Sequence, residues 1–137
     1  MDPAVIARND RMIAVNSILE VDLTGQCNAE SLDGSQFSGT GGQLDFVRGA
    51  YQSKGGKAIL AFYSTAKNGE LSRIVPRLPE GATVTTPRMD THYLATEYGV
   101  VNLKGQSSRE RALSIVSLAH PRFRDDLLRE AEKMGLF

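Results

Sequence analysis

Three glycines stand directly before a helix-like run in "SGTGGQLDFVRGA", residues 38–50. A glycine-rich loop that leads into a helix presents several backbone N–H groups at the positive end of the helix dipole. Such a loop suits a phosphate, a carboxylate or a developing oxyanion. The spacing of Gly39, Gly41 and Gly42 fits neither the nucleotide phosphate loop nor the dinucleotide-binding pattern. From these residues alone, a structural turn explains the glycines at least as well as a ligand site.

The other reactive side chains are scattered along the chain. His92 and His120 have no metal-ligand spacing with Cys27 or a carboxylate, so we expect no metal site. We expect His92 to be a hydrogen-bonded core residue or a subunit contact, and His120 to lie at a helix break. Cys27 has no neighbouring base or cation to activate its thiol, which indicates a small buried residue. Glu97 is a nucleophile by type, but a carboxylate at a strand end more often caps a nearby turn.

The size and composition indicate one domain. The chain has 137 residues and 41% hydrophobic content, enough for one ordinary core. Sixteen basic residues balance sixteen acidic ones, so no long-range field favours nucleic acid or an anionic membrane. No apolar run reaches the roughly 20 residues of a spanning helix, and the first residues lack the apolar core of a signal peptide. The single cysteine excludes an internal disulfide, and we expect a cytosolic protein with no nucleic-acid or membrane partner.

Hydrophobic patterning predicts a mixed sheet. The continuous apolar run "KAILAFY", residues 57–63, has the length of a strand and is typical of a strand covered on both faces. We therefore expect helices on either side of the sheet. Further strands are predicted from shorter runs bounded by Pro and Gly, at residues 12–23, 27–31, 71–75, 82–86 and 92–99.

Helical patterns lie between and after the predicted strands. An apolar face made by Leu44, Val47 and Tyr51 predicts a helix after the glycine loop, which ends at Lys54-Gly55-Gly56. Asp45 and Arg48, three residues apart in that helix, are expected to form a surface ion pair.

Two more helices are expected at the end of the chain. Ser107 and Glu110 have the spacing of a capping box, which starts one helix. His120-Pro121 ends it and begins another. The predicted fold class is α/β, a mixed sheet flanked by helices with a C-terminal helical hairpin.

Longer motifs carry a family resemblance. They are "NSILEVDLTGQCNAESLDGSQFSGTGGQLDFVRGA", "STAKNGELSRIVPRL", "TTPRMDTHYLATEYGVVNLKG" and "SSRERALSIVSLAHPRFRDDLL". Together they resemble the C-terminal domain of the acetyl-CoA hydrolase and CoA-transferase family, of the 4-hydroxybutyrate CoA-transferase type. The resemblance covers nearly all of residues 1–137 in the family's order. It implies the NagB/RpiA/CoA-transferase-like fold.

The resemblance also implies an activity. Enzymes of this family move coenzyme A between short-chain carboxylic acids through a glutamyl-CoA thioester, and covalent catalysis divides the exchange into easier steps. Their nucleophilic glutamate lies upstream, in a His-Thr-Glu type motif that has no match in this sequence. Glu97 belongs to the separate motif "TEYG". The N-terminal domain of the same enzyme is therefore an expected partner, and this chain alone is expected to be inactive.

Five residues match positions that contact CoA in the family. The resemblance implies that the Gly42 N–H lies near the reacting thioester carbonyl, with Ser38 and Gly41 shaping the CoA contact. Lys67 in "STAK" would face the phosphates of CoA, although its plainer interpretation is a lysine in solvent. Leu19 would touch the pantetheine arm. The implied ligands are CoA or acyl-CoA and a short-chain carboxylate, without a metal.

One departure and several alternatives remain. Where the family has an asparagine before "DPAVI", this chain has Met1, which suggests a cut through the family's sequence. A non-catalytic CoA-binding or assembly module is the main alternative, and an acetyl-CoA hydrolase is another. The sequence leaves a homodimer open.

Overall fold

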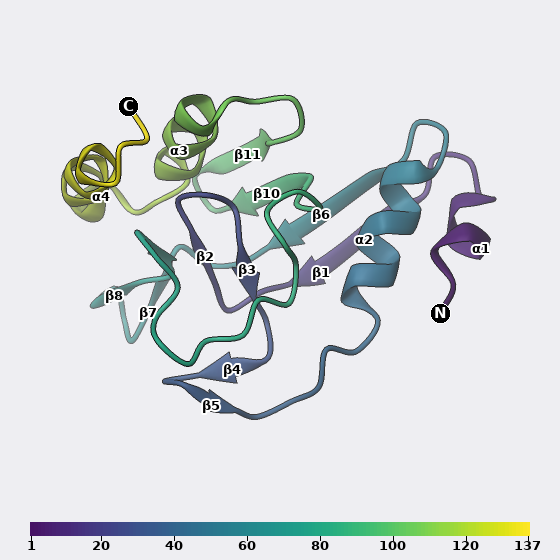
Figure 1. Cartoon of the computed structure of the whole chain (residues 1–137), viewed down its shortest axis with the longest axis horizontal. Helices are drawn as coiled ribbons and strands as arrows, with labels where there is room; N and C mark the ends of the chain where they lie inside the picture. Colours follow the sequence, from purple (N-terminus) through teal and green to yellow (C-terminus); the bar gives the residue numbers. More distant parts are fainter.

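The computed structural model describes residues 1–137, and Figure 1 shows the arrangement of their helices and strands. The helices are α1 (Pro3–Ala7), α2 (Gln43–Gln52), α3 (Ser108–Ser117) and α4 (Pro121–Lys133). The strands are β1 (Ile13–Ser17), β2 (Glu20–Asp22), β3 (Cys27–Asn28), β4 (Ser31–Leu32), β5 (Ser35–Gln36), β6 (Lys57–Ala61), β7 (Thr65–Ala66), β8 (Leu71–Ser72), β9 (Ile74–Val75), β10 (Tyr93–Thr96) and β11 (Gly99–Asn102).

The main sheet has four strands in the order β1-β6-β10-β11. β1, β6 and β10 are parallel, with Val15, Ile59 and Tyr93 in register, and β11 returns antiparallel to β10. The carboxyl ends of the three parallel strands therefore meet at one edge. A second sheet, β3-β2-β9, and the hairpins β4–β5 and β7–β8 complete the strands. This arrangement confirms the predicted mixed α/β fold.

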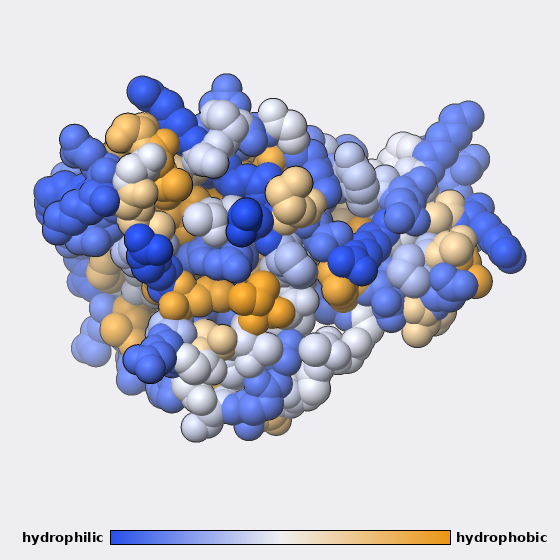
Figure 2. Space-filling view, in the orientation of Figure 1, coloured by the Kyte–Doolittle hydropathy of each residue, from blue (hydrophilic) through white to orange (hydrophobic).

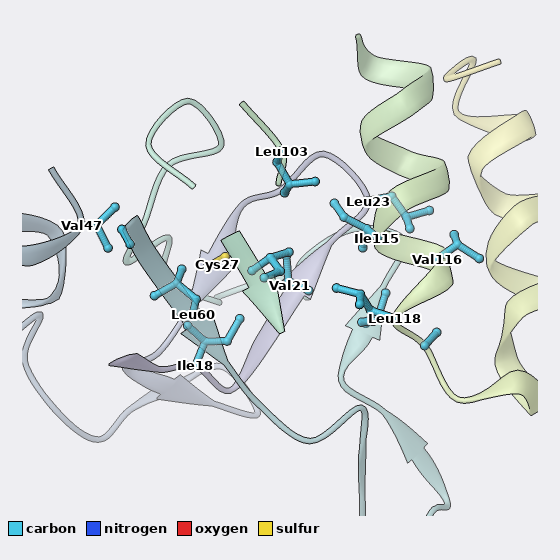
Figure 3. Packing of buried hydrophobic residues seen from close by; sticks show 14 of the residues in the cluster. Ile18, Val21, Leu23, Cys27, Val47, Leu60, Leu103, Ile115, Val116 and Leu118 are labelled. Carbon is cyan, nitrogen blue, oxygen red and sulfur yellow. The ribbon is translucent and has the colours of Figure 1, made fainter. Parts of the chain in front are cut away.

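One hydrophobic core joins the main sheet to the second sheet and the helices. Figure 3 shows Val21, from the second sheet, between Leu60 of the main sheet and Ile115 of α3. Val47 of α2 packs against the same cluster. Figure 1 places α1 beside α2 at one end of the molecule and α3 and α4 at the other. Buried aliphatic side chains thus hold the two sheets and the long helices as one body.

The outer surface in Figure 2 is mostly hydrophilic, with separate apolar patches among the polar side chains. No helix in residues 1–137 is both long and apolar enough to cross a membrane.

The C-terminal helices begin where local chemistry predicts. The Ser107 hydroxyl accepts a hydrogen bond from the N–H of Glu110, whose carboxylate accepts one from the N–H of Ser107 at 2.8 Å. This capping box satisfies N–H groups that have no partner within the helix. His120 Nδ1 accepts a hydrogen bond from the N–H of Arg122 at 3.1 Å, so this histidine caps α4. Both predicted helix starts are confirmed.

Five predicted strands differ in the structure. Residues 27–31 divide between β3 and the start of β4, and residues 71–75 divide between β8 and β9, which belong to different sheets. Residues 12–23 are interrupted at Ile18-Leu19, because the chain passes there from the main sheet to the second. Residues 92–99 divide into β10 and the start of β11 at a tight turn. Residues 82–86 form no strand and make a single bridge, between Thr86 and Cys27. Side chains hold that segment instead, since the Thr85 hydroxyl donates to Glu30 at 2.6 Å.

The expected ion pair within α2 is wrong. Arg48 instead pairs with Asp90, with Nε–Oδ1 and Nη2–Oδ2 distances of 2.9 and 3.1 Å. Asp45 lies 3.4 Å from the N-terminal amine of Met1. The planar guanidinium binds a carboxylate best through two parallel hydrogen bonds, and Asp90 offers that geometry.

His92 and Cys27 are both buried, as expected from the sequence. His92 Nδ1 accepts a hydrogen bond from the N–H of Ala58 at 3.3 Å. Burial, and secondarily the charges of Lys104 and Lys57, lower the pKa of His92. Its imidazole therefore serves as a neutral part of the core.

We expect the thiol of Cys27 to be inert in the folded protein. Burial raises the pKa of Cys27 from 9.0 to about 12, so the reactive thiolate is scarce at pH 8. Iodoacetamide at pH 8 should label Cys27 only after unfolding in urea. Because the folded pKa is the higher one, the free energy of unfolding should fall as the pH rises from 9.0 through about 12. Rapid labelling of the native protein would contradict this burial.

Candidate functional site

A cavity of about 470 Å³ opens at the carboxyl ends of β1, β6 and β10. Ligands of open α/β sheets bind outside the carboxyl ends of the strands, so this edge is the first candidate for a site. The residues that line it are Ser17, Ile18, Ala61, Phe62, Tyr63, Arg73, Ala95, Thr96 and Glu97. Most of this lining is apolar, with one cationic and one anionic side chain.

Glu97 supplies the negative charge of the cavity. Its Oε1 accepts a hydrogen bond from the N–H of Ser64 at 2.8 Å, just beyond the end of β6. Partial burial disfavours the charged form, but the hydrogen bond from the Ser64 N–H, with a smaller contribution from the charge of His120, outweighs it, and the pKa of Glu97 lies below its ordinary value. The carboxylate is thus ionised and caps a turn, as its position at a strand end indicated.

Arg73 supplies the positive charge, and no sequence pattern singled this residue out. Its Nη1 donates a hydrogen bond to the carbonyl of Leu19 at 3.1 Å, while its buried Nε has no partner. Leu19 itself is held by a hydrogen bond from its N–H to the carbonyl of Asn28 at 2.8 Å. Leu19 therefore meets the cavity through Arg73 and does not line it.

The helix that follows the glycine loop is linked to this cavity by a hydrogen bond. Gln43, the first residue of α2, donates from Nε2 to the carbonyl of Ser17 at 3.0 Å, and its Oε1 accepts from the Thr86 hydroxyl at 2.8 Å. Ser17 is both the last residue of β1 and part of the cavity lining. Gly42 is the N-cap of α2, and its exposed N–H donates to no acceptor within the chain. The loop therefore has a free N–H donor one residue before the side chain that reaches the carboxyl edge of the sheet.

Internal packing does not explain all three glycines of the loop. Gly41 has a φ of +58°, a conformation that favours glycine. A Cβ built on Gly39 would meet nothing within 4 Å, and one on Gly42 would lie 3.6 Å from the nearest ring carbon, an ordinary contact. At Gly56, in contrast, a Cβ would lie 2.1 Å from the carbonyl oxygen of Ala50. Gly56 is needed for packing, whereas Gly42 has room for a side chain.

The other predicted contact residues are placed differently. Ser38 is exposed at the start of the loop, where its hydroxyl donates to the carbonyl of Gly39 at 3.3 Å. Lys67 is exposed in the turn of the β7–β8 hairpin, and its ammonium has no hydrogen-bond or ion-pair partner. The hairpin leaves the sheet at Ser64, whose carbonyl accepts from the N–H of Arg73 at 2.8 Å. Lys67 does not line the cavity and is connected to it only through the backbone of this hairpin.

A second cavity, of about 680 Å³, lies at the other end of α2. Lys104 donates to the carbonyl of Met89 at 2.5 Å and lies 4.1 Å above the ring of Tyr51. The buried Arg111 donates to three backbone carbonyls. These two cations of the lining are therefore engaged within the fold. No group of three or more His, Cys, Asp or Glu residues in the chain is arranged to hold a metal.

Comparison with known proteins shows which family this chain belongs to. Residues 1–131 match the acetyl-CoA hydrolase/transferase C-terminal domain. The succinyl-CoA:cyclohexane-1-carboxylate CoA transferase of Geobacter metallireducens is 52% identical over 133 residues, which are 97% of this chain and 30% of that protein. The 4-hydroxybutyrate coenzyme A transferase of Clostridium kluyveri is 52% identical over 132 residues, 96% of this chain and 31% of that protein.

Solved structures agree with this result. RipA from Yersinia pestis is 59% identical, with a TM-score of 0.93 over 99% of this chain and 30% of its own. The alfa subunit of a citrate lyase from Streptococcus mutans, at 22% identity and a TM-score of 0.57, shares the fold over 94% of this chain and 20% of its own. The chain spans about a third of the length of its curated relatives. It belongs to the acetyl-CoA hydrolase/transferase family, where it matches the C-terminal domain.

Proposed function

We propose that this chain is the CoA-contacting C-terminal domain of a CoA-transferase that acts on short-chain carboxylic acids. One observation carries the proposal: the unpartnered N–H of Gly42, with space around it for a side chain, directly precedes Gln43, whose side chain binds Ser17 at the edge of the cavity. Relatives at 52% identity are CoA transferases, one of them for 4-hydroxybutyrate.

The proposed role of Gly42 is electrostatic. When a carboxylate attacks the carbonyl carbon of a thioester, the electron pair of the C=O bond moves onto oxygen. A backbone N–H fixed at a helix start can stabilise that charge without reorganising. The attacking glutamate would come from the part of the enzyme that precedes this domain. Collapse of the tetrahedral intermediate would expel the CoA thiolate and leave an acyl-glutamyl anhydride. The thiolate would then attack the glutamyl carbonyl, which releases the first carboxylate and forms the glutamyl-CoA thioester, and the second acid would take up CoA by the same two steps in reverse.

The remaining predicted residues fit the rest of the CoA molecule. Ser38 and Gly41 would shape the loop around the thioester end, and the apolar cavity would accept the pantetheine arm or the acyl chain. The contact of Leu19 would be indirect, through Arg73. Lys67, exposed and without an internal partner, is free to meet a phosphate.

Hydrolysis is the second candidate activity, because the acetyl-CoA hydrolase of Kluyveromyces lactis is 35% identical over 112 residues, 80% of this chain and 21% of that protein. The two activities differ in whether a carboxylate or water attacks the glutamyl-CoA thioester. Attack by water would release free CoA and regenerate the glutamate. That choice depends on groups around the intermediate, including those from the rest of the enzyme.

The test uses a chimera, the joined protein, in which this chain replaces the matching C-terminal segment of the 4-hydroxybutyrate coenzyme A transferase of Clostridium kluyveri. We expect acetyl-CoA and 4-hydroxybutyrate to yield acetate and 4-hydroxybutyryl-CoA. Free CoA released without an acid acceptor would show hydrolysis instead. A folded joined protein that does neither reaction would leave a non-catalytic module as the better description.

A further inference from the structure

One face of the main sheet has no covering layer in this chain. Along β1 the side chains alternate, with Ala14 buried while Ile13 and Val15 are 51% and 63% exposed. The neighbouring strands show the same alternation, since Leu60 and Leu94 are fully buried but Val100 is 61% exposed. Exposed positions that are in register across strands point to the same side of the sheet.

These positions, together with two half-buried ones between them, define an apolar surface, which we call the bare sheet face: Ile13, Val15, Ile59, Tyr93 and Val100. Lys57, the exposed register partner of Ile13, borders this face, with its ammonium 5.9 Å from the centroid of the Tyr93 ring. Val15, Ile59 and Tyr93 are direct register partners on three adjacent strands. Helices α2 and α3 lie on the opposite side. Val47 of α2 and Ile115 of α3 pack in the same core as Leu60 and Leu94. The expectation of helices on both sides of the sheet is therefore not met within residues 1–137.

A parallel sheet with one open apolar face is incomplete. Parallel sheets occur almost only with both faces covered, usually by helices. Accessible apolar side chains on neighbouring strands are also unlike the scattered apolar residues of an ordinary surface. β1 is in addition an edge strand, paired only with β6. Both features predict that further polypeptide packs here.

We infer that the bare sheet face binds an apolar helical layer from the part of the polypeptide that its full-length relatives have in addition to this domain. The chain makes up only 30% of the length of these relatives, which leaves ample polypeptide to form that layer. Ala61 and Ala95, which continue the bare sheet face toward the carboxyl ends of their strands, also line the 470 Å³ cavity. The docked layer therefore reaches the edge of the candidate site. This inference rests on the fold and on the length comparison, and it does not require CoA transfer.

The test measures whether a thiol on this face becomes protected. Val100→Cys places a thiol on the bare sheet face, and Leu113→Cys places a control thiol on the exposed side of α3, where Leu113 is 41% exposed. Each variant is treated with a maleimide, in this chain and in the joined protein, and the labelled peptide is quantified by mass spectrometry. The native Cys27 is buried in the chain and serves as an internal unreactive reference.

We expect the maleimide reaction of the Val100→Cys thiol to be at least about tenfold slower in the joined protein than in this chain, because a packed interface excludes the reagent. The Leu113→Cys thiol should react at similar rates in both proteins. Equal labelling of the Val100→Cys thiol in the two proteins would overturn the inference, and so would equal protection of both thiols. A Val100→Cys thiol already protected in the isolated chain by self-association would assign the face to a second copy instead.

These outcomes are independent of the activity assay. A joined protein that protects the Val100→Cys thiol but transfers no CoA would keep the docking face and reject the proposed reaction. A joined protein that transfers CoA while its Val100→Cys thiol stays reactive would support the proposed reaction and reject the docking face.

Discussion

Replacing Gly42 with valine in the joined protein should lower the rate of CoA transfer by a factor of about 10² to 10³, the usual effect of losing one oxyanion donor. Gly42 has a φ of −98° and room for a Cβ, so the fold should tolerate the change. The valine side chain would stand between the N–H and the thioester carbonyl. The effect should appear in kcat/KM measured with acetyl-CoA as the varied substrate.

Gly39 offers a matched control for this experiment. It lies in the same loop, has no positive φ, and has empty space where a Cβ would stand. Gly39→Ala should therefore leave kcat/KM close to that of the parent protein. A folded Gly42→Val variant with nearly full activity would show that the Gly42 N–H does not contact the reacting carbonyl.

Replacing Arg111 with methionine should cost about 3 kcal/mol or more of the free energy of unfolding, as expected when a buried charged hydrogen-bond network is lost. Arg111 is only 9% exposed, and its guanidinium donates to the carbonyls of Thr24, Arg88 and Leu103. These three carbonyls belong to separate loops, so one side chain ties the loops together. Methionine retains the aliphatic stem and removes only the donors. Urea unfolding of the isolated chain measures the difference.

Arg129 provides the control for Arg111. It is exposed on α4 and pairs only with the exposed Asp126. Arg129→Met should change the free energy of unfolding by no more than about 0.5 kcal/mol, as is usual at an exposed surface site. Equal effects of the two substitutions would show that the buried guanidinium is not a main tie between the loops.

Sequence patterns predicted the parts of the fold that depend on local chemistry. The capping box of Ser107 and Glu110 needs only residues three apart, and the structure contains it. The run that becomes β6 is long and apolar enough to be recognised without its neighbours. In contrast, residues 82–86 look like a strand, but their partners are Cys27 and Glu30, more than fifty residues away. No local pattern indicates that side chains would replace a strand ladder there.

The candidate site was also predictable only where it depends on residues close together in the sequence. The glycine loop is visible in the sequence, and the family resemblance links it to CoA. Arg73 could not be found in this way, because it lines the cavity only once β9 has paired with β2. The position of Arg111 was hidden as well, since its three acceptors come from distant loops. The order of the strands brings these residues together, and that order is a property of the folded chain.

Amide N–H correlation spectra of the isotope-labelled chain, recorded while CoA is added, test the central claim most directly. The method detects weak binding, which is expected when only part of the site is present. We predict saturable shifts of the Gly41 and Gly42 amide signals, and their loss in a folded Gly42→Val variant. Saturable CoA-dependent shifts confined to another surface, with the loop signals unchanged, would contradict the claim that the glycine loop of this domain contacts CoA.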